Sequence, residues 1–365
     1  MQRVVSGGRA RLHCQKPIGL EGFNSSMVAI RAIISGCLGT SLTAAEKQFF
    51  ANLNPLGLIL FRRNCETPDQ LMALTTSFRE AVGRKNAPVF IDQEGGRVQR
   101  LGPPNNAWRK YPPASAYGVL YEENPVAALR SARNIGRLMA EDLIAAGINA
   151  NCVPVLDVPQ PGAHEIIGSR AYSFRIEPIM ALARAHAAGF IDGGVIPVIK
   201  HIPGHGRARA DSHMELPVVE ASRAELAAVD FPPFAAFADA PMAMTAHVVY
   251  TALDKTAPAT HSKKIISGII RSEIGFRGLL MTDDLSMKAL SGSYTEKTRA
   301  ALDAGCDVVL HCNGEMDEMQ EVAAAAGDLR GKALQRARAA LKTVRKPQPF
   351  DRKAALKDFE VIASR

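Results

Sequence analysis

The chain has 365 residues, of which 47% are hydrophobic and 22% are charged, a composition typical of a globular protein with a large core. Its formal net charge is +8, but no lysine- and arginine-rich run with interleaved aromatic residues is present, which disfavours nucleic-acid binding. No run reaches the roughly 18 apolar residues that a membrane-spanning helix requires, so we expect no membrane span.

The first 26 residues and the cysteines indicate where the protein acts. Residues 1–26 are polar and lack the apolar stretch and small-residue cleavage site of a secretory signal. We expect this segment to be a disordered or mis-called extension, and we exclude it from the fold. None of the six cysteines lies in a Cys-x-x-Cys pair, which is typical of free buried thiols in a reducing compartment. We therefore expect a cytoplasmic protein.

Short apolar runs recur along the chain, and each ends in polar residues or glycine. Eight such runs stand, in chain order, at 32–39, 56–61, 87–95, 148–158, 195–204, 242–250, 278–286 and 306–314. Helical patterns lie between them, several with a glycine at the end, at 41–53, 68–82, 124–147, 177–194, 222–238 and 261–275. The first helical pattern begins with a capping box, because Glu46 follows Thr43 by three residues.

The order of these elements predicts the fold class. Apolar runs that barely alternate with polar residues, and that are separated by helices, predict parallel strands covered on both faces. Eight strands close a (β/α)8 barrel of the TIM type, so we predict a single α/β barrel domain over 27–345. An open doubly wound sheet is the alternative, but no Gly-x-Gly-x-x-Gly fingerprint follows an early strand. We expect 346–365 to be a helical C-terminal tail.

Charged and imidazole side chains follow the predicted strands at their carboxyl ends. In a barrel these ends meet at one mouth, where the active site lies. Burying so many charges together without a use would be costly, so the pattern predicts a catalytic site. The residues are Asp92, Glu94 and Arg97 after the third run, Asp157 after the fourth, Lys200 and His201 after the fifth, His247 after the sixth, and Asp283 and Asp284 after the seventh.

The segment 200–217, KHIPGHGRARADSHMELP, is dense in titratable side chains. Metal binding is one interpretation, with His201, His205, Asp211 and His213 as the candidate ligands, although their spacing is not that of one helix face. A phosphate-binding loop is another, but the segment lacks the GxxxxGK[ST] pattern. Proton transfer is a third, because an aspartate beside an imidazole fixes its tautomer and raises its pKa. On spacing alone, Asp211 could equally cap a turn and His213 lie on the surface.

Adjacent aspartates end the seventh run. On a strand, Asp283 and Asp284 face opposite ways, so only one of them can point into the mouth. The other is expected to cap the turn that follows. The spacing alone does not choose between them.

The same segment resembles the KHFPGHG…DSH…LP signature of the bacterial β-N-acetylglucosaminidases of glycoside hydrolase family 3, enzymes of peptidoglycan recycling. Seven further motifs look like family segments in family order: GLILFRRN, IDQEGGRVQRL, VPVLDV, IGSRAYS, MTAHVVY, GLLMTDDLSM and LDAGCDVVLHCN. The resemblance covers roughly residues 30–315. A lone DQEGG would be weak, whereas this ordered series is specific.

The resemblance implies a (β/α)8-type barrel that hydrolyses a terminal β-linked N-acetylglucosamine with retention of configuration. It implies Asp283 as the nucleophile and His213, paired with Asp211, as the general acid/base in place of the usual second carboxyl group. The residues that it implies for the sugar hydroxyls are Asp92, Arg100, Arg170, Lys200 and His201. His247 and His205 are possible pocket lining, while Trp108 and Tyr111 either form a wall for the leaving group or pack their proline-rich loop.

The resemblance also sets the expected partners. The substrate would be a N-acetylglucosamine-anhydro-muropeptide, and we expect a monomer without a metal or another cofactor. A phosphorylase is the alternative, because an imidazole acid/base places less negative charge near C1 than a carboxylate and would tolerate phosphate as the acceptor. A metal-dependent hydrolase that uses the histidine cluster is a more distant alternative.

Overall fold

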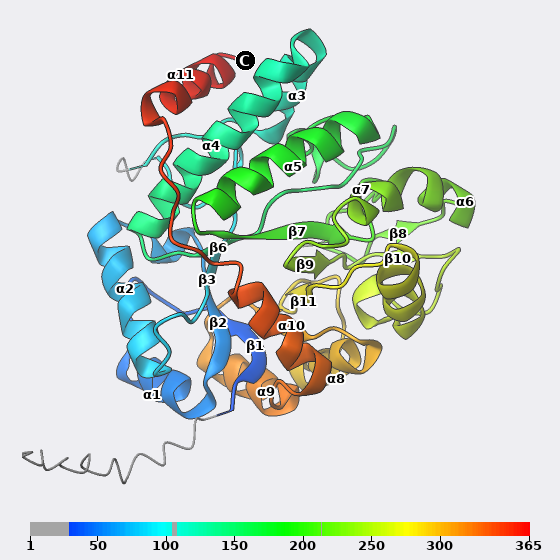
Figure 1. The fold of residues 1–365 in the computed structure, drawn as a ribbon. Coiled ribbons are helices and arrows are strands. Elements are labelled where there is room, and N and C mark those ends of the chain that lie inside the picture. The colour runs from blue at the N-terminus through cyan, green and yellow to red at the C-terminus, as the bar shows by residue number, and fades with distance from the viewer. Residues whose placement is uncertain (1–28, 104–107, 213) are drawn as a thin grey trace, which may run out of the picture.

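Eight parallel strands close into a barrel in the computed structural model, which describes residues 29–103, 108–212 and 214–365 (Figure 1). The strands are β1 (Arg31–Ser35), β2 (Pro55–Leu60), β3 (Val89–Ile91), β6 (Ala150–Asn151), β7 (Ile196–Ile202), β9 (Met242–Thr245), β11 (Leu279–Asp284) and β12 (Val308–His311). Neighbours in the barrel follow chain order, and β1 closes the ring because it pairs with both β2 and β12. Each strand overlaps one predicted run, so the (β/α)8 prediction is confirmed.

Helices surround the barrel (Figure 1). They are α1 (Ala44–Leu53), α2 (Pro68–Ala81), α3 (Ala114–Glu123), α4 (Pro125–Ala145), α5 (Ile176–Asp192), α6 (Arg223–Glu225), α7 (Phe231–Ala235), α8 (Tyr294–Ala304), α9 (Met316–Ala326), α10 (Gly331–Leu341) and α11 (Arg352–Ala363), with π-helical turns η3 (Leu226–Asp230) and η5 (Ile265–Glu273). The predicted capping box begins α1, where Thr43 Oγ1 accepts from Glu46 N at 3.1 Å and Thr43 N donates to Glu46 Oε2 at 2.7 Å. Within the described residues, no helix has the length and apolar character needed to cross a membrane.

Short strands and 3₁₀ turns lie in the loops between the barrel strands and the helices. An antiparallel pair, β4 (Gln93–Gly95) and β5 (Val98–Gln99), follows β3, and a parallel pair joins β8 (Val218–Val219) to β10 (Val249–Tyr250). Three short 3₁₀ turns are η1 (Arg62–Asn64), η2 (Gly168–Arg170) and η4 (Ala259–His261).

The proline-rich loop after β5 packs inward, which decides between the two predicted roles of its aromatic residues. Trp108 and Tyr111 are both buried in the core. The hydroxyl of Tyr111 donates to Asp142 Oδ2 on α4 at 2.6 Å, and its ring meets the ring of Phe359 edge-on, with centroids 5.6 Å apart. These side chains therefore pack the loop and do not wall the mouth.

The last helix, α11, lies against α4 on the outside of the barrel (Figure 1). Asp358, buried at this contact, accepts from Arg130 Nη2 at 2.9 Å and from Asn134 Nδ2 at 2.7 Å. The predicted tail thus includes a helix that is held by buried polar contacts as well as by the apolar residues Ala355 and Ile362.

A buried asparagine in the barrel fixes the segment that follows β3. Asn151, in β6, accepts from the backbone N of Gln93 through Oδ1 and donates to the backbone O of Gln93 through Nδ2, both at 2.9 Å. The side chain of Gln93 in turn accepts from the backbone N of Arg100 and Leu101 at 3.0 and 2.9 Å. One side chain on β6 therefore fixes the position of the two residues that flank Gln93.

We predict that Asn151→Ala lowers the free energy of unfolding by about 2 kcal/mol, because the buried peptide of Gln93 loses its side-chain partners. Urea unfolding followed by circular dichroism measures this change. The exposed Asn86→Ala is the control, since a surface asparagine without such contacts should change stability by less than about 0.5 kcal/mol. Equal effects of the two substitutions would contradict the role of Asn151.

Candidate active site

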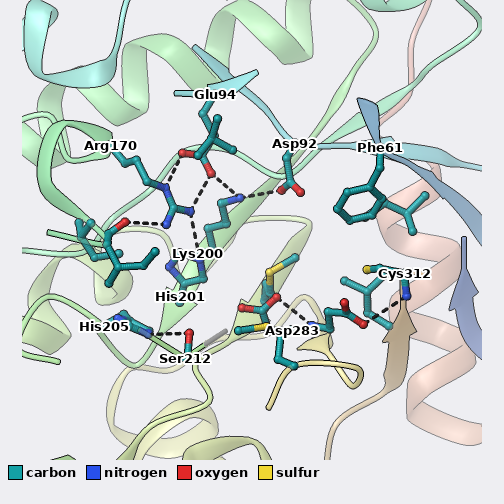
Figure 2. Close-up of a pocket in the computed structure, with 18 of the residues that line it drawn as sticks. Phe61, Asp92, Glu94, Arg170, Lys200, His201, His205, Ser212, Asp283 and Cys312 are labelled. Atoms are coloured by element: carbon teal, nitrogen blue, oxygen red, sulfur yellow. Dashed lines mark hydrogen bonds and ion pairs between the residues drawn. The ribbon is translucent and has the colours of Figure 1, made fainter. Parts of the chain in front are cut away.

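A cavity of about 340 Å³ opens at the carboxyl ends of the barrel strands (Figure 2). Residues from the ends of six strands and from the loops after them contribute to its wall. Among them are Phe61 after β2, Asp92 after β3, Lys200 and His201 in β7, Met244 in β9, Asp283 in β11 and Cys312 after β12. The mouth of the barrel is thus the place where the predicted polar residues converge.

One wall of the cavity carries alternating charges (Figure 2). Arg100 Nη2 lies 3.0 Å from Asp92 Oδ2, and Lys200 Nζ lies 2.8 Å from Asp92 Oδ1. Lys200 Nζ also lies 2.7 Å from Glu94 Oε1, and Glu94 receives two N–H donors of Arg170 at 2.8 Å. We call these five residues the charge ladder; its members come from the stretch 92–100, from η2 and from β7.

The charge ladder holds its carboxylates in the ionised form. Burial alone would raise the pKa of Glu94, but the charges of Arg170 and Lys200 lower it to about 2. Burial likewise opposes ionisation of Asp92, and the charges of Lys200 and Arg100 outweigh it and hold the pKa of Asp92 well below its usual range. Neither carboxyl group therefore retains a proton at neutral pH.

A buried aspartate orients His201. Asp157 Oδ2 lies 2.7 Å from His201 Nδ1, and Asp157 Oδ1 accepts from the backbone N of His205 at 2.6 Å. Since a carboxylate accepts, the proton of the neutral ring is assigned to Nδ1, and Nε2 lies 3.5 Å from Arg170 Nη2. Lys200 and His201 both line the cavity, although neighbours in a regular strand face opposite ways; the register of β7 shifts between Lys200 and Ile202.

The two possible lining histidines lie in different places. His205 lines the cavity, with Nε2 3.3 Å from Ser212 Oγ. His247 is not among the lining residues. Its ring is held between Thr260 Oγ1, 2.7 Å from Nδ1, and the backbone O of Asp284, 3.1 Å from Nε2. These contacts occupy both ring nitrogens, so His247 has a structural role behind the cavity wall.

The adjacent aspartates at the end of β11 both line the cavity, against the prediction that only one of them would face the mouth, but their contacts differ. Asp284 accepts from the backbone N of Ser286 at 3.0 Å and of Cys312 at 3.2 Å, so it holds the turn after the strand. Asp283 lines the cavity, and its Oδ1 accepts from Asp284 N at 2.8 Å. Burial raises the pKa of Asp283, but the nearby His247 and His201, this backbone contact and Lys200 lower it below its usual value. Asp283 is therefore an ionised carboxylate inside the cavity (Figure 2).

The segment that carries the predicted proton-transfer pair borders the same cavity. His213 lies outside the described residues. Ser212, the residue before it, is buried at the cavity wall, and its backbone O accepts from Ala289 N at 3.3 Å. Asp211 is half-buried, and its backbone O accepts from the N of Met214 and Glu215 at 2.8 and 3.0 Å.

Sequence reasoning placed two buried carboxylates, Glu94 and Asp157, at the mouth but gave neither of them a role in the site. Glu94 stands two residues after Asp92, so strand periodicity places both on one face and could have identified it. Asp157 was found at a strand end, but its contact with His201 depends on the tertiary arrangement. Phe61 also lines the cavity, with the Arg100 guanidinium 4.8 Å from its ring centroid. Nothing in the sequence indicated that contact.

The candidate metal ligands include His213, which lies outside the described residues. Within residues 29–103, 108–212 and 214–365, no three His, Cys, Asp or Glu side chains are grouped so that they could hold a metal ion.

We predict that acid destabilises the folded protein through His205. Burial is the main cause that lowers the pKa of His205 to about 4, whereas an imidazole in an unfolded chain titrates near about 6.5. Between these pH values the unfolded chain binds a proton that the folded chain does not. Stability therefore falls as the pH falls from about 6.5 to about 4, by up to about 1.4 kcal/mol per pH unit for this group.

Urea unfolding at several pH values between about 7.5 and 5 tests this expectation. His205→Gln should reduce the slope of stability against pH by about one proton. The exposed His164→Gln is the control for removal of an imidazole. A slope that stays at the wild-type value in His205→Gln contradicts the expectation.

The sequence of the chain matches a known protein family along most of its length. The model of the glycosyl hydrolase family 3 N terminal domain matches residues 25–344. A beta-hexosaminidase of Alkalilimnicola ehrlichii is 39% identical over 285 residues, which is 77% of this chain and 80% of that protein. A beta-hexosaminidase of Nitrosomonas eutropha is 37% identical over 279 residues, 75% of this chain and 78% of the other.

Solved structures agree with the sequence matches. The crystal structure of native NagZ from Neisseria gonorrhoeae is 31% identical and covers 92% of this chain and 98% of its own, with a TM-score of 0.81. The same protein solved in complex with N-trifluoroacetyl-D-glucosamine gives a TM-score of 0.79 at 31% identity, with coverage of 92% and 97%. The chain therefore belongs to glycosyl hydrolase family 3, as the resemblance of its motifs to the β-N-acetylglucosaminidases of that family indicated.

Proposed function

We propose that this protein is a retaining exo-β-N-acetylglucosaminidase that removes terminal N-acetylglucosamine from peptidoglycan fragments, with Asp283 as the nucleophile and His213 as the general acid/base. The broader assignment as a β-N-acetylhexosaminidase rests on the family match and on the relatives. The observation that carries the finer proposal is an ionised, cavity-lining Asp283 whose neighbouring carboxylates are all committed to other contacts.

A nucleophilic carboxylate needs a negative charge and an oxygen that can reach the anomeric carbon. Asp283 has both, because its one hydrogen bond recorded among the described residues goes to Oδ1. Asp284, by contrast, uses its carboxylate to hold Ser286 and Cys312. These contacts favour Asp283 over Asp284.

The general acid must carry a proton at neutral pH, and this requirement favours an imidazole. Asp92 and Glu94 are held ionised by the charge ladder, so neither can protonate a leaving group. The pKa of His205 lies at about 4, so its ring is largely unprotonated near pH 7. His213 directly follows Ser212 at the cavity wall, and Asp211 stands two residues before it, as an orienting carboxylate would.

The proposed reaction has two displacements. A carboxylate oxygen of Asp283 bonds to C1 of the sugar while the C1–O bond to the leaving group breaks and the leaving oxygen takes the proton of His213. A water molecule then gives a proton to His213 and bonds to C1, and the ester bond to Asp283 breaks. Two inversions give net retention, and both enzyme groups return to their starting states.

The charge ladder and His201 suit a polar monosaccharide, because they offer both donors and acceptors around one cavity. The complex of a relative with N-trifluoroacetyl-D-glucosamine supports an N-acylated glucosamine as the bound sugar. We further propose action as a monomer in the cytoplasm on anhydro-muropeptides. The buried free cysteines Cys37, Cys65, Cys152, Cys306 and Cys312 are consistent with a reducing compartment.

We predict that Asp283→Ala lowers kcat/KM for aryl β-N-acetylglucosaminides by at least about 10³-fold, because no covalent intermediate can form. Mass spectrometry after incubation of the wild type with a 2- or 5-fluoro N-acetylglucosamine analogue should locate the sugar on Asp283 in the peptide GLLMTDDLSMK. A label on Asp284, or no label, contradicts the assignment. A sugar 1-phosphate product in phosphate buffer would instead indicate a phosphorylase, and loss of activity on chelation a metal-dependent enzyme.

We predict that the cost of His213→Ala depends on the leaving group. Substrates with a poor leaving group need the proton and should lose about 10²- to 10⁴-fold in kcat, whereas aryl substrates with a good leaving group should lose far less. A series of aryl β-N-acetylglucosaminides with graded leaving-group pKa measures this dependence. Equal losses across the series would argue against an acid role.

A further inference from the structure

We infer that Glu94 is a positioning residue for the proposed reaction: it fixes Arg170 and Lys200 so that each presents one N–H donor to the sugar. This inference rests on the proposed function of the same cavity. The sequence placed Glu94 at the mouth but gave it no role, and in the structure it lies in the wall drawn in Figure 2, between Arg170 and Asp92.

Glu94 connects two cations that belong to separate parts of the chain. Arg170 lies in η2, after β6, and Lys200 lies in β7. Both lie within hydrogen-bonding distance of the same oxygen, Glu94 Oε1, with Arg170 Nη2 at 2.8 Å and Lys200 Nζ at 2.7 Å. Arg170 Nε completes a fork on Oε2 at 2.8 Å. A planar fork of this kind fixes the guanidinium in orientation as well as in place.

Glu94 itself is poorly suited to bind the sugar or to transfer a proton. Its residue is 7% exposed, and its two oxygens already receive three charge-assisted contacts. The cations keep it ionised at neutral pH. Its contribution to the reaction therefore passes through Arg170 and Lys200.

Counting donors shows what the arrangement leaves for a ligand. Lys200 has three N–H donors, of which Asp92 and Glu94 receive one each, so one stays uncommitted among the described residues. Arg170 has five, of which Glu94 receives two, Ile166 O one at 3.1 Å and His201 Nε2 one at 3.5 Å. Each cation therefore uses all but one of its N–H donors in contacts with other described residues.

Loss of the Glu94 charge would disturb this arrangement in a specific way. The charge ladder balances three cations with two carboxylates, and Asp283 supplies a further negative charge in the same cavity. Without Glu94, Arg170 and Lys200 repel each other, and each has donors that can turn to other partners. The sugar would then be held out of line with Asp283, and a misplacement of about 1 Å can cost about 10²-fold in rate.

Kinetics and thermal unfolding of the full-length Glu94→Gln and Glu94→Asp variants test the inference. Glu94→Gln removes the charge at nearly constant shape, and we expect kcat/KM for an aryl β-N-acetylglucosaminide to fall about 100-fold. Glu94→Asp keeps the charge, but its side chain is too short to reach both cations. Its Tm should therefore lie nearer to the wild-type value than that of Glu94→Gln, while its kcat/KM stays low. The loss should be the same for good and poor leaving groups, unlike that of His213→Ala.

The matched control is Glu122→Gln. Glu122 receives Arg175 Nη2 at 2.7 and 2.9 Å in an exposed pair away from the cavity, so kcat/KM should stay within about twofold of the wild type. A folded Glu94→Gln with kcat/KM within about threefold of the wild type would overturn the inference. A Glu94→Asp variant in which both Tm and kcat/KM return to the wild-type values would also overturn it. If Glu94→Gln does not fold, the result for Glu94→Asp alone tests the inference. Failure of the proposed function is separate, since the wild type would then lack hydrolysis and labelling.

Discussion

Opposite charges buried side by side at the barrel mouth are the constraint on which the site depends. Taking one carboxylate or ammonium group out of water costs several kcal/mol, and Lys200 and Glu94 are tolerable there only because each lies beside the other. The same contacts fix the ionisation of the wall. Because the wall carboxylates stay charged, the proposed mechanism assigns the chemistry to Asp283 and to a group that can carry a proton at neutral pH.

The barrel was readable from the sequence because its strands are parallel and covered on both faces. Such strands appear as apolar runs, and the helices between them carry their own caps, as at Thr43 and Glu46. The convergence of Asp92, Lys200 and Asp283 followed from the architecture alone, since strand ends meet at one mouth. The number of residues between them along the chain does not affect this convergence, because each of them stands at the end of a barrel strand.

What the sequence did not reveal are contacts between distant segments. Glu94 meets Arg170 across 76 positions of the chain, and Asp157 meets His201 across 44. Local patterns cannot predict such pairs, because the partner is chosen by the packing of other strands. His247 is the converse case: strand position placed it near the mouth, but hydrogen bonds to Thr260 and to the backbone of Asp284 keep its ring behind the wall.

The edge-on contact between Tyr111 and Phe359 has a consequence for synthesis of the protein. Tyr111 accepts from Gly96 N through its backbone O at 2.8 Å, and Gly96 lies in the turn directly after β4, the strand that holds Glu94. Phe359 belongs to α11, which is translated after every strand of the barrel. The ribosome therefore completes every barrel strand before it makes the helix that packs against Tyr111.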